Sequence, residues 1–132
     1  MTDQLVQLVR LRAEGRCEYC RLPDALSMLP FEIDHIIAIK HHGLTRKDNL
    51  AYSCCYCNSY KGPNIAGIDP KLGLVTALFH PRKQKWSTHF KWKGGLLLGK
   101  TAVGRVTIDV LLINQPERVV QRKASMIAGL FE

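Results

Sequence analysis

The feature that most constrains this chain is a pair of two-cysteine motifs, Cys17-x-x-Cys20 and Cys54-x-x-Cys57. A gap of two residues lets one turn present two thiolates to the same metal ion, and structural zinc prefers four such ligands in a tetrahedron. The motifs therefore predict a structural zinc site that joins the two ends of the segment between them. That segment, residues 21–53, is longer than in the usual zinc ribbon, so we expect it to carry secondary structure of its own.

A disulfide framework is the alternative interpretation of these cysteines. No secretory signal is visible ahead of them, and four of the five cysteines fall into the two motifs. Both observations favour zinc and a cytoplasmic protein. The remaining cysteine, Cys55, lies between two expected ligands, and we expect its side chain to point away from the metal.

An acidic residue and a histidine are neighbours within an apolar run between the two motifs. Residues 30–39 are rich in β-branched side chains and predict a short buried strand, on which Asp34 and His35 point to opposite faces. Both can serve one site if the strand ends there, as the polar loop over residues 40–48 indicates. A carboxylate suits a hard cation such as Mg²⁺, and a neutral imidazole suits proton abstraction. A core histidine bonded to a backbone carbonyl is the ordinary alternative for His35.

Three segments together resemble the HNH endonuclease family, in the zinc-knuckle branch of the ββα-metal fold: Asp34-His35, Asp48-Asn49-Leu50 and Cys54-x-x-Cys57-Asn58-x-x-Lys61-Gly62. Asn58 stands where other members carry a histidine, a variant that active members also use. Segments 67–70, 78–82 and 89–92 are similar to one bacterial subgroup of the family. The resemblance thus covers nearly the whole chain, although it assigns no catalytic group beyond Gly62.

The resemblance implies a role for each motif residue. His35 is similar to the general base that takes a proton from the attacking water, and Asn49 to the residue that orients this histidine through the loop backbone or the ring. Asp34 and Asn58 resemble the ligands of a single catalytic cation, Mg²⁺ or Mn²⁺, which is separate from the structural Zn²⁺. The implied activity is hydrolysis of phosphodiester bonds in DNA, with RNA as a further substrate to consider. The alternative is a catalytically inactive, zinc-stabilised nucleic-acid-binding module.

The net charge of +8 is concentrated in the second half of the chain. Residues 1–62 carry eight Lys and Arg against seven Asp and Glu, whereas residues 63–132 carry eleven against four. Surplus cationic charge gives salt-sensitive affinity for nucleic acid. Residues 85–93 alternate with period two and predict a strand that presents lysines on one face, with a plain solvated sheet edge as the alternative. The expected nucleic-acid contacts are Lys61, Arg82, Lys85, Lys91 and Lys93.

The loop over residues 40–48 also contains two adjacent histidines, His41 and His42. Neighbouring loop histidines are poorly placed to converge on one ion, so a solvated loop is the better interpretation. Arg46 or Lys47 could contact substrate phosphates from the same loop.

The pattern as a whole predicts one α+β domain over residues 1–132. Residues 1–66 form the zinc-knuckle ββα-metal core, with an N-terminal helix over residues 3–14. Residues 67–132 form a basic, β-rich extension that ends in a helix. The predicted strands are residues 30–39, 50–53, 74–79, 85–93, 96–98 and 105–113. On the final helix we expect Val119, Val120, Ile127, Leu130 and Phe131 to be buried and Arg118, Arg122 and Lys123 to face solvent. No apolar run approaches the length of a membrane span, and the pattern does not predict an oligomeric state.

Overall fold

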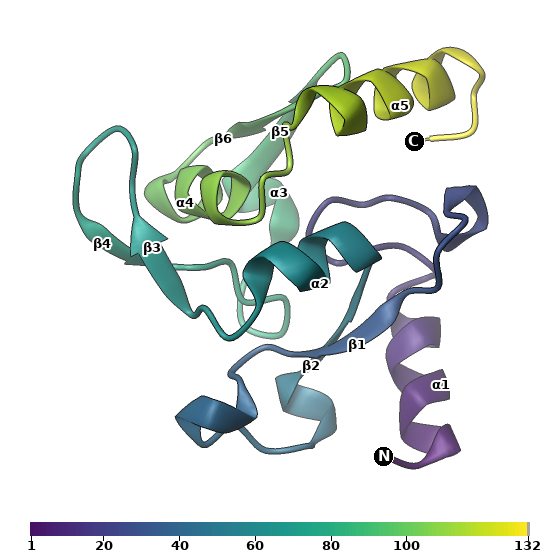
Figure 1. The fold of residues 1–132 in the computed structure, drawn as a ribbon, viewed down its shortest axis with the longest axis vertical. Coiled ribbons are helices and arrows are strands. Elements are labelled where there is room, and N and C mark those ends of the chain that lie inside the picture. Colours follow the sequence, from purple (N-terminus) through teal and green to yellow (C-terminus); the bar gives the residue numbers. More distant parts are fainter. Residues whose placement is uncertain (132) are drawn as a thin grey trace.

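The N-terminal half of the chain forms a two-stranded antiparallel ribbon followed directly by a helix (Figure 1). The computed structural model describes residues 1–131. In it, β1 (Glu32–His35) pairs with β2 (Leu50–Ser53), so that Asp34 lies opposite Ala51 and His35 opposite Leu50. Helix α2 (Cys55–Lys61) begins two residues after β2 ends. This order of strand, strand and helix confirms the predicted ββα core.

Helix α1 (Asp3–Arg12) covers one side of this ribbon. Its start is capped by the Thr2 hydroxyl, which accepts a hydrogen bond from the amide of Leu5 at 3.2 Å. Val9 and Ala13 pack with side chains of β2 in a small hydrophobic cluster. The predicted N-terminal helix is therefore confirmed, and it rests on the strand that leads into α2.

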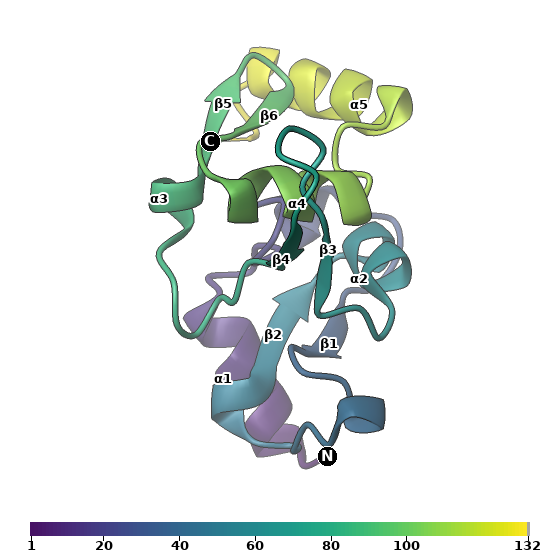
Figure 2. The ribbon, with the colours of Figure 1, turned by 90° about the vertical axis from the view of Figure 1, so that its left-hand side faces the viewer.

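The second half contains two hairpins and three helices within the described residues. Helix α4 packs against β6 and against both strands of the β3–β4 hairpin (Figure 1 and Figure 2). The elements are β3 (Ala66–Ile68), β4 (Val75–Ala77), α3 (Trp86–His89), β5 (Phe90–Lys93), β6 (Leu96–Gly99), α4 (Ala102–Val110) and α5 (Pro116–Ile127). Short 3₁₀ turns occupy Asp24–Leu26, Ile39–His41 and Lys47–Asn49. The mixed α+β class is confirmed.

One large hydrophobic cluster runs through both halves of the chain. It contains the four motif cysteines together with Phe79, Phe90, Val106 and Phe131. The cysteine site is thus part of the main core. None of the helices in residues 1–131 combines the length and the apolar character needed to cross a bilayer.

The predicted strand over residues 105–113 is wrong, because most of this segment lies in helix α4. The hydroxyl of Thr101 caps the helix by accepting from the amide of Gly104 at 3.1 Å. Val106 and Val110 are alternate apolar residues, but they are also four apart and so share one face of a helix. That face packs so closely on β3 that a Cβ atom at Gly67 would lie 2.6 Å from Val110 and 2.9 Å from Val106.

The predicted strand over residues 85–93 is only partly correct. Residues Trp86–His89 form the single turn α3, and the strand β5 begins at Phe90. The Trp86 indole donates to the carbonyl of Tyr19 at 2.8 Å and packs on the Phe90 ring at a centroid distance of 5.1 Å. These contacts turn the backbone before β5, so Lys85 does not share a strand face with Lys91 and Lys93.

The predicted burial of the final helix is wrong for Arg118, Arg122, Val120, Ile127 and Leu130, whereas Lys123 is exposed as predicted. Arg118 and Arg122 are buried, whereas Val120 and Ile127 are 68% and 79% exposed. The arginines reach buried backbone carbonyls and the cysteine cluster, partners that the sequence of the helix does not reveal. Phe131 is buried as expected.

Candidate metal centre and nuclease site

The four motif cysteines converge on one buried point. Cys17 and Cys20 come from the turn after α1, Cys54 caps the start of α2, and Cys57 lies in its first turn. Their sulfur atoms all lie within 4.8 Å of one another, and those of Cys20 and Cys54 are 3.7 Å apart. A tetrahedral zinc ion with Zn–S bonds of about 2.3 Å separates its sulfurs by about 3.8 Å. The four residues therefore fit a zinc ion, and Cys55 lies outside the group.

These sulfurs lie in the hydrophobic core, and a charged side chain from α5 reaches them. Burial raises the pKa of Cys17 and Cys57, whereas hydrogen bonds from the neighbouring thiols lower that of Cys20. Arg118 of α5 donates to the sulfur of Cys57 at 3.0 Å and approaches that of Cys54 at 3.8 Å. Burial alone would lower the pKa of Arg118, but the cysteine thiolates raise it. A guanidinium at this position offsets the negative charge that four thiolates bring to one metal.

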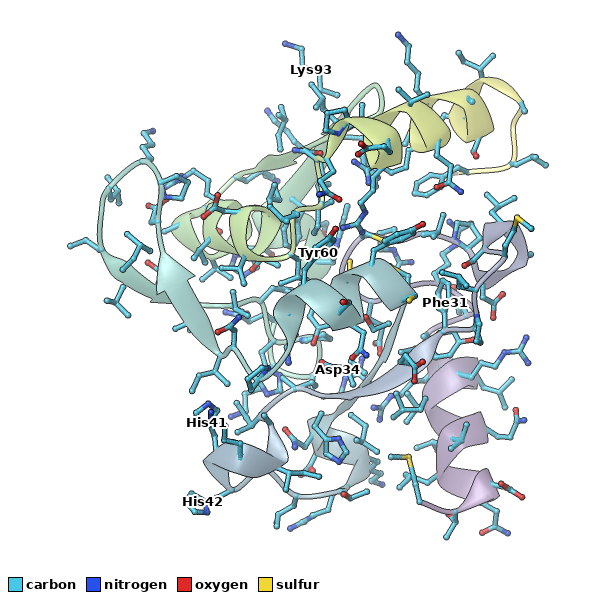
Figure 3. All side chains as sticks on the ribbon, viewed as in Figure 1. Phe31, Asp34, His41, His42, Tyr60 and Lys93 are labelled. Carbon is cyan, nitrogen blue, oxygen red and sulfur yellow. The ribbon has the colours of Figure 1, made fainter. Side chains whose placement is uncertain are left out.

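Asp34 lies on β1, on the side of the ribbon that faces α2 (Figure 3). Its carboxylate is 5% exposed, and both oxygens already have partners. The Tyr19 hydroxyl donates to Oδ2 at 2.6 Å, and the Lys61 ammonium lies 3.2 Å from Oδ1 and 3.1 Å from Oδ2. Burial raises the pKa of Asp34, an effect that Lys61 and the Tyr19 hydroxyl oppose.

Lys61 requires a correction. It was expected to contact nucleic acid, but its side chain is 1% exposed. Besides both oxygens of Asp34, its ammonium donates to the backbone carbonyl of His35 at 3.1 Å. Lys61 therefore belongs to the site itself, and in this structure its ammonium is bonded to Asp34 and to the carbonyl of His35 instead of facing solvent.

His35, the next residue on β1, is half-buried and contacts the loop between the two strands. Its Nε2 lies 2.9 Å from the hydroxyl of Thr45. Asn49 fixes that loop from inside: its amide oxygen accepts from the amide of Ile37 at 2.9 Å, and its amide nitrogen donates to the carbonyls of Ile37 and Leu44 at 3.0 and 2.9 Å. Asn49 thus holds both ends of the loop that carries Thr45 to the imidazole.

Asn58, the second expected ligand of a catalytic cation, is half-buried on α2. It lies three residues before Lys61, and residues three apart share one face of a helix. The oxygens of Asp34 and Asn58 are hard donors that suit Mg²⁺ or Mn²⁺. However, Lys61 already neutralises the only carboxylate of the pair. These residues therefore fit a divalent cation only if the Lys61 ammonium leaves Asp34.

The expected nucleic-acid contacts lie in different environments. The Arg82 guanidinium is bonded to the carboxylate of Glu18 and, at 3.3 Å, to the carbonyl of Leu50, and its contact with nucleic acid stays a prediction. Lys85, Lys91 and Lys93 are exposed. Figure 3 shows Lys93 at the end of the molecule that carries α5, away from Asp34.

The histidine pair of the loop behaves as a solvated feature. His41 and His42 are exposed on the 3₁₀ turn after β1 (Figure 3). Among residues 1–131, the motif cysteines form the one group of three or more metal-ligating side chains that could share an ion.

Two residues of the site, Tyr19 and Thr45, are not among the predicted site residues. Tyr19 lies between two expected zinc ligands, so the motif that places the sulfurs also places its hydroxyl on Asp34; its position was a usable signal. Thr45 lies in a polar loop among other hydrogen-bonding residues, and nothing in the local sequence distinguishes it.

The comparison with known protein families agrees with this geometry. Residues 17–64 match the model of the HNH endonuclease family. The match begins at the first zinc ligand and ends just after α2, so it covers the cysteine cluster and the ββα core. It supports a nuclease-like role.

Among individual proteins, the chain is similar to the Septu protein PtuB of Bacillus thuringiensis. The two are 29% identical over 112 residues, which cover 82% of this chain and 40% of that protein. The chain therefore spans less than half the length of this relative. No solved structure matches the chain.

Proposed function

We propose that the chain is a metal-dependent endonuclease that hydrolyses phosphodiester bonds of DNA. The observation that carries this proposal is the arrangement of Asp34 and His35 at the end of β1, next to α2. They lie beside the loop that the Asn49 side chain holds through its hydrogen bonds to Ile37. An acid and an imidazole fixed at one edge are what a hydrolytic site requires. RNA has the same phosphodiester linkage and is the natural second substrate to assay.

The role we assign to His35 is that of general base. The Thr45 hydroxyl contacts Nε2, and when Nε2–H donates to it, the lone pair lies on Nδ1 and can accept a proton from water. Asn49 acts as a positioning residue, because it holds the loop on which Thr45 lies. An imidazole held in one orientation and one tautomer is a better base than a mobile one.

The role we assign to Asp34 and Asn58 is to hold a Mg²⁺ or Mn²⁺ ion at the scissile phosphate. When bound, such an ion supplies charge stabilisation to the phosphate and to the leaving oxygen. The four cysteines would hold a separate structural Zn²⁺ that supports the fold. The exposed lysines Lys85, Lys91 and Lys93 would add non-specific attraction for the DNA backbone.

A zinc-stabilised nucleic-acid-binding module without activity is the second candidate. The contact between Lys61 and Asp34 favours it, because a permanent ion pair would keep a catalytic cation out. The two candidates differ in whether DNA is cut, which one assay decides.

The test is cleavage of supercoiled plasmid by zinc-loaded protein with Mg²⁺ or Mn²⁺. The metal-free control should omit divalent salts rather than add EDTA, because EDTA would also remove zinc. We expect His35→Ala to lower the cleavage rate by about 10²- to 10⁴-fold, the usual contribution of a general base. His42→Ala is the matched control, since His42 is an exposed histidine of the adjacent loop. Cleavage by folded His35→Ala protein at the wild-type rate would exclude the proposed mechanism.

A further inference from the structure

Lys61 is a buried ionisable group at the centre of the site that the proposed mechanism does not use. Its ammonium makes three polar contacts, to Oδ1 and Oδ2 of Asp34 and to the carbonyl of His35, at 3.1 to 3.2 Å. A buried lysine is normally retained only where a partner satisfies its charge. Asp34 is that partner.

The charges of the site leave no place for a second cation beside Asp34. The charges of the Asp34 carboxylate and the Lys61 ammonium sum to zero, and among residues 1–131 the other hydrogen bond to the carboxylate comes from the neutral Tyr19 hydroxyl. Mg²⁺ and Mn²⁺ bind through carboxylates and substrate phosphates. A divalent ion on Asp34 would therefore meet a like charge at close range, within a site that excludes most solvent.

A cavity next to Lys61 offers its ammonium a second position. Lys61 is the last residue of α2, and it lines this cavity of about 170 Å³ together with Ile37, Leu78, His80 and Lys83. Most of the side chains that line this cavity are apolar; its charged side chains are Lys61 and Lys83, and no carboxylate is among the lining residues. A phosphate group there would be drawn to Lys61 and Lys83, and it would offer Lys61 an anion in place of Asp34.

We propose that Lys61 is an exchangeable internal cation: it holds the Asp34 carboxylate in the free protein and transfers to a phosphate of the nucleic acid in the adjacent cavity, which frees Asp34 for a divalent ion. This inference rests on the proposed function. It makes binding of the divalent ion depend on binding of the substrate. Free protein then has little affinity for Mg²⁺ or Mn²⁺, and the complex with nucleic acid has more.

The first test measures Mn²⁺ binding to zinc-loaded protein, by electron paramagnetic resonance and without nucleic acid. Lys61→Met keeps most of the apolar stem and removes the charge, so we expect it to bind Mn²⁺ at least about tenfold more tightly than wild type. Lys83→Met is the matched control: it removes a cation from the same cavity that has no bond to Asp34, and it should bind as wild type does. The double variant Asp34→Asn/Lys61→Met should lose the gain.

Several outcomes would overturn the proposal. One is equal or weaker Mn²⁺ binding by a Lys61→Met variant that retains zinc and a cooperative thermal transition. Another is an equal gain in Lys83→Met, which would indicate a general effect of charge. A third is a gain that survives Asp34→Asn, because the ion would then bind elsewhere.

A second measurement uses the wild-type protein, in case Lys61→Met does not fold. A buried, bonded ammonium exchanges its protons slowly enough to give a ¹H–¹⁵N signal. We expect the Lys61 signal to shift or disappear when Mg²⁺ and an uncleavable phosphorothioate oligonucleotide are added together, and to stay in place with Mg²⁺ alone. A signal that stays in place with both would overturn the proposal.

None of these measurements requires cleavage, so the two proposals fail separately. If the protein does not cut DNA but Lys61→Met gains affinity for Mn²⁺, the proposed exchange of Lys61 stands and the proposed nuclease function fails. If the protein cuts DNA through His35 but binds Mn²⁺ equally with and without Lys61, the nuclease function stands and the exchange fails.

Discussion

Arg118 is the single side chain through which the C-terminal helix α5 donates to the cysteine sulfurs. One arm of its guanidinium donates to Cys57, and the other donates to the carbonyls of Leu111 and Leu112 at 2.9 and 3.2 Å. Groups that bond to metal ligands commonly change metal affinity by about 10- to 100-fold. Arg118 should therefore control how firmly zinc is held.

We expect Arg118→Met to release zinc to a chromogenic chelator about tenfold faster than wild type, because the thiolates lose a charged donor. Arg122→Met is the control. Arg122 is equally buried on the same helix, but it bonds to the carbonyl of Gly95 and to Asn114 and not to sulfur. It should lower thermal stability with little change in the rate of zinc release. Equal release rates in the two variants would mean that Arg118 acts only through packing.

The loop between β1 and β2 depends on one glycine. A Cβ atom at Gly43 would lie 1.7 Å from the carbonyl oxygen of Ile37 and 2.9 Å from the side-chain amide nitrogen of Asn49. These two atoms share a hydrogen bond of the Asn49 clasp, the set of contacts from the Asn49 side chain to Ile37 and Leu44 that holds the loop carrying Thr45. No side chain fits at Gly43 while this clasp is closed.

Gly43→Ala should therefore open the clasp, lower the free energy of unfolding by about 1–3 kcal/mol and reduce cleavage by misplacing His35. Gly73→Ala is a useful comparison, because Gly73 has a φ of +72° but no atom within 4 Å of its missing Cβ. It should cost about 1–2 kcal/mol from backbone conformation and leave cleavage unchanged. Denaturant unfolding and the plasmid assay measure both effects. Normal cleavage by Gly43→Ala would show that the clasp does not position His35.

The elements that the sequence predicted well are those defined by strong local chemistry. The strand over residues 50–53 has the predicted bounds, and α2 begins at Cys55, because the cysteine motif fixes the turn between them. The strand predicted over residues 105–113 is wrong because the spacing of Val106 and Val110 fits both the two-residue period of a strand and the period of a helix. The Arg118–Cys57 bond joins residues 61 apart in the chain. No local pattern in α5 indicates that its arginines, and not its valines, face inward.

At the scale of the whole molecule, one buried ion pair connects the β3–β4 hairpin to α4. Both oxygens of Asp69 accept from the Arg105 guanidinium, at 2.9 and 2.8 Å, and Asp69 is fully buried. The hydrogen bonds from Arg105 lower the pKa of Asp69 to about 2. The ordinary value for aspartate is about 3.9, so the ionised form is favoured in the folded state.

A group whose pKa is lower in the folded state stabilises the protein above the unfolded pKa of that group. This stabilisation is lost as the pH falls through the folded pKa. We therefore expect wild type to be more stable than Asp69→Asn by a constant margin from pH 8 to about 5. The margin should narrow below about pH 4 and approach its minimum near pH 2. Urea midpoints of the two proteins at each pH measure it, and loss of zinc in acid affects both alike. A margin independent of pH would mean that the pair contributes no charge-dependent stability.

Tyr19 lies inside the first cysteine motif and donates its hydroxyl to Asp34. The turn that closes around zinc is therefore also one wall of the proposed catalytic site. Two binding equilibria that share a structural element are thermodynamically linked, and the coupling acts equally in both directions. If both ions bind as proposed, occupancy of the cysteine site changes the affinity of Asp34 for its cation, and the cation changes the retention of zinc by the same factor.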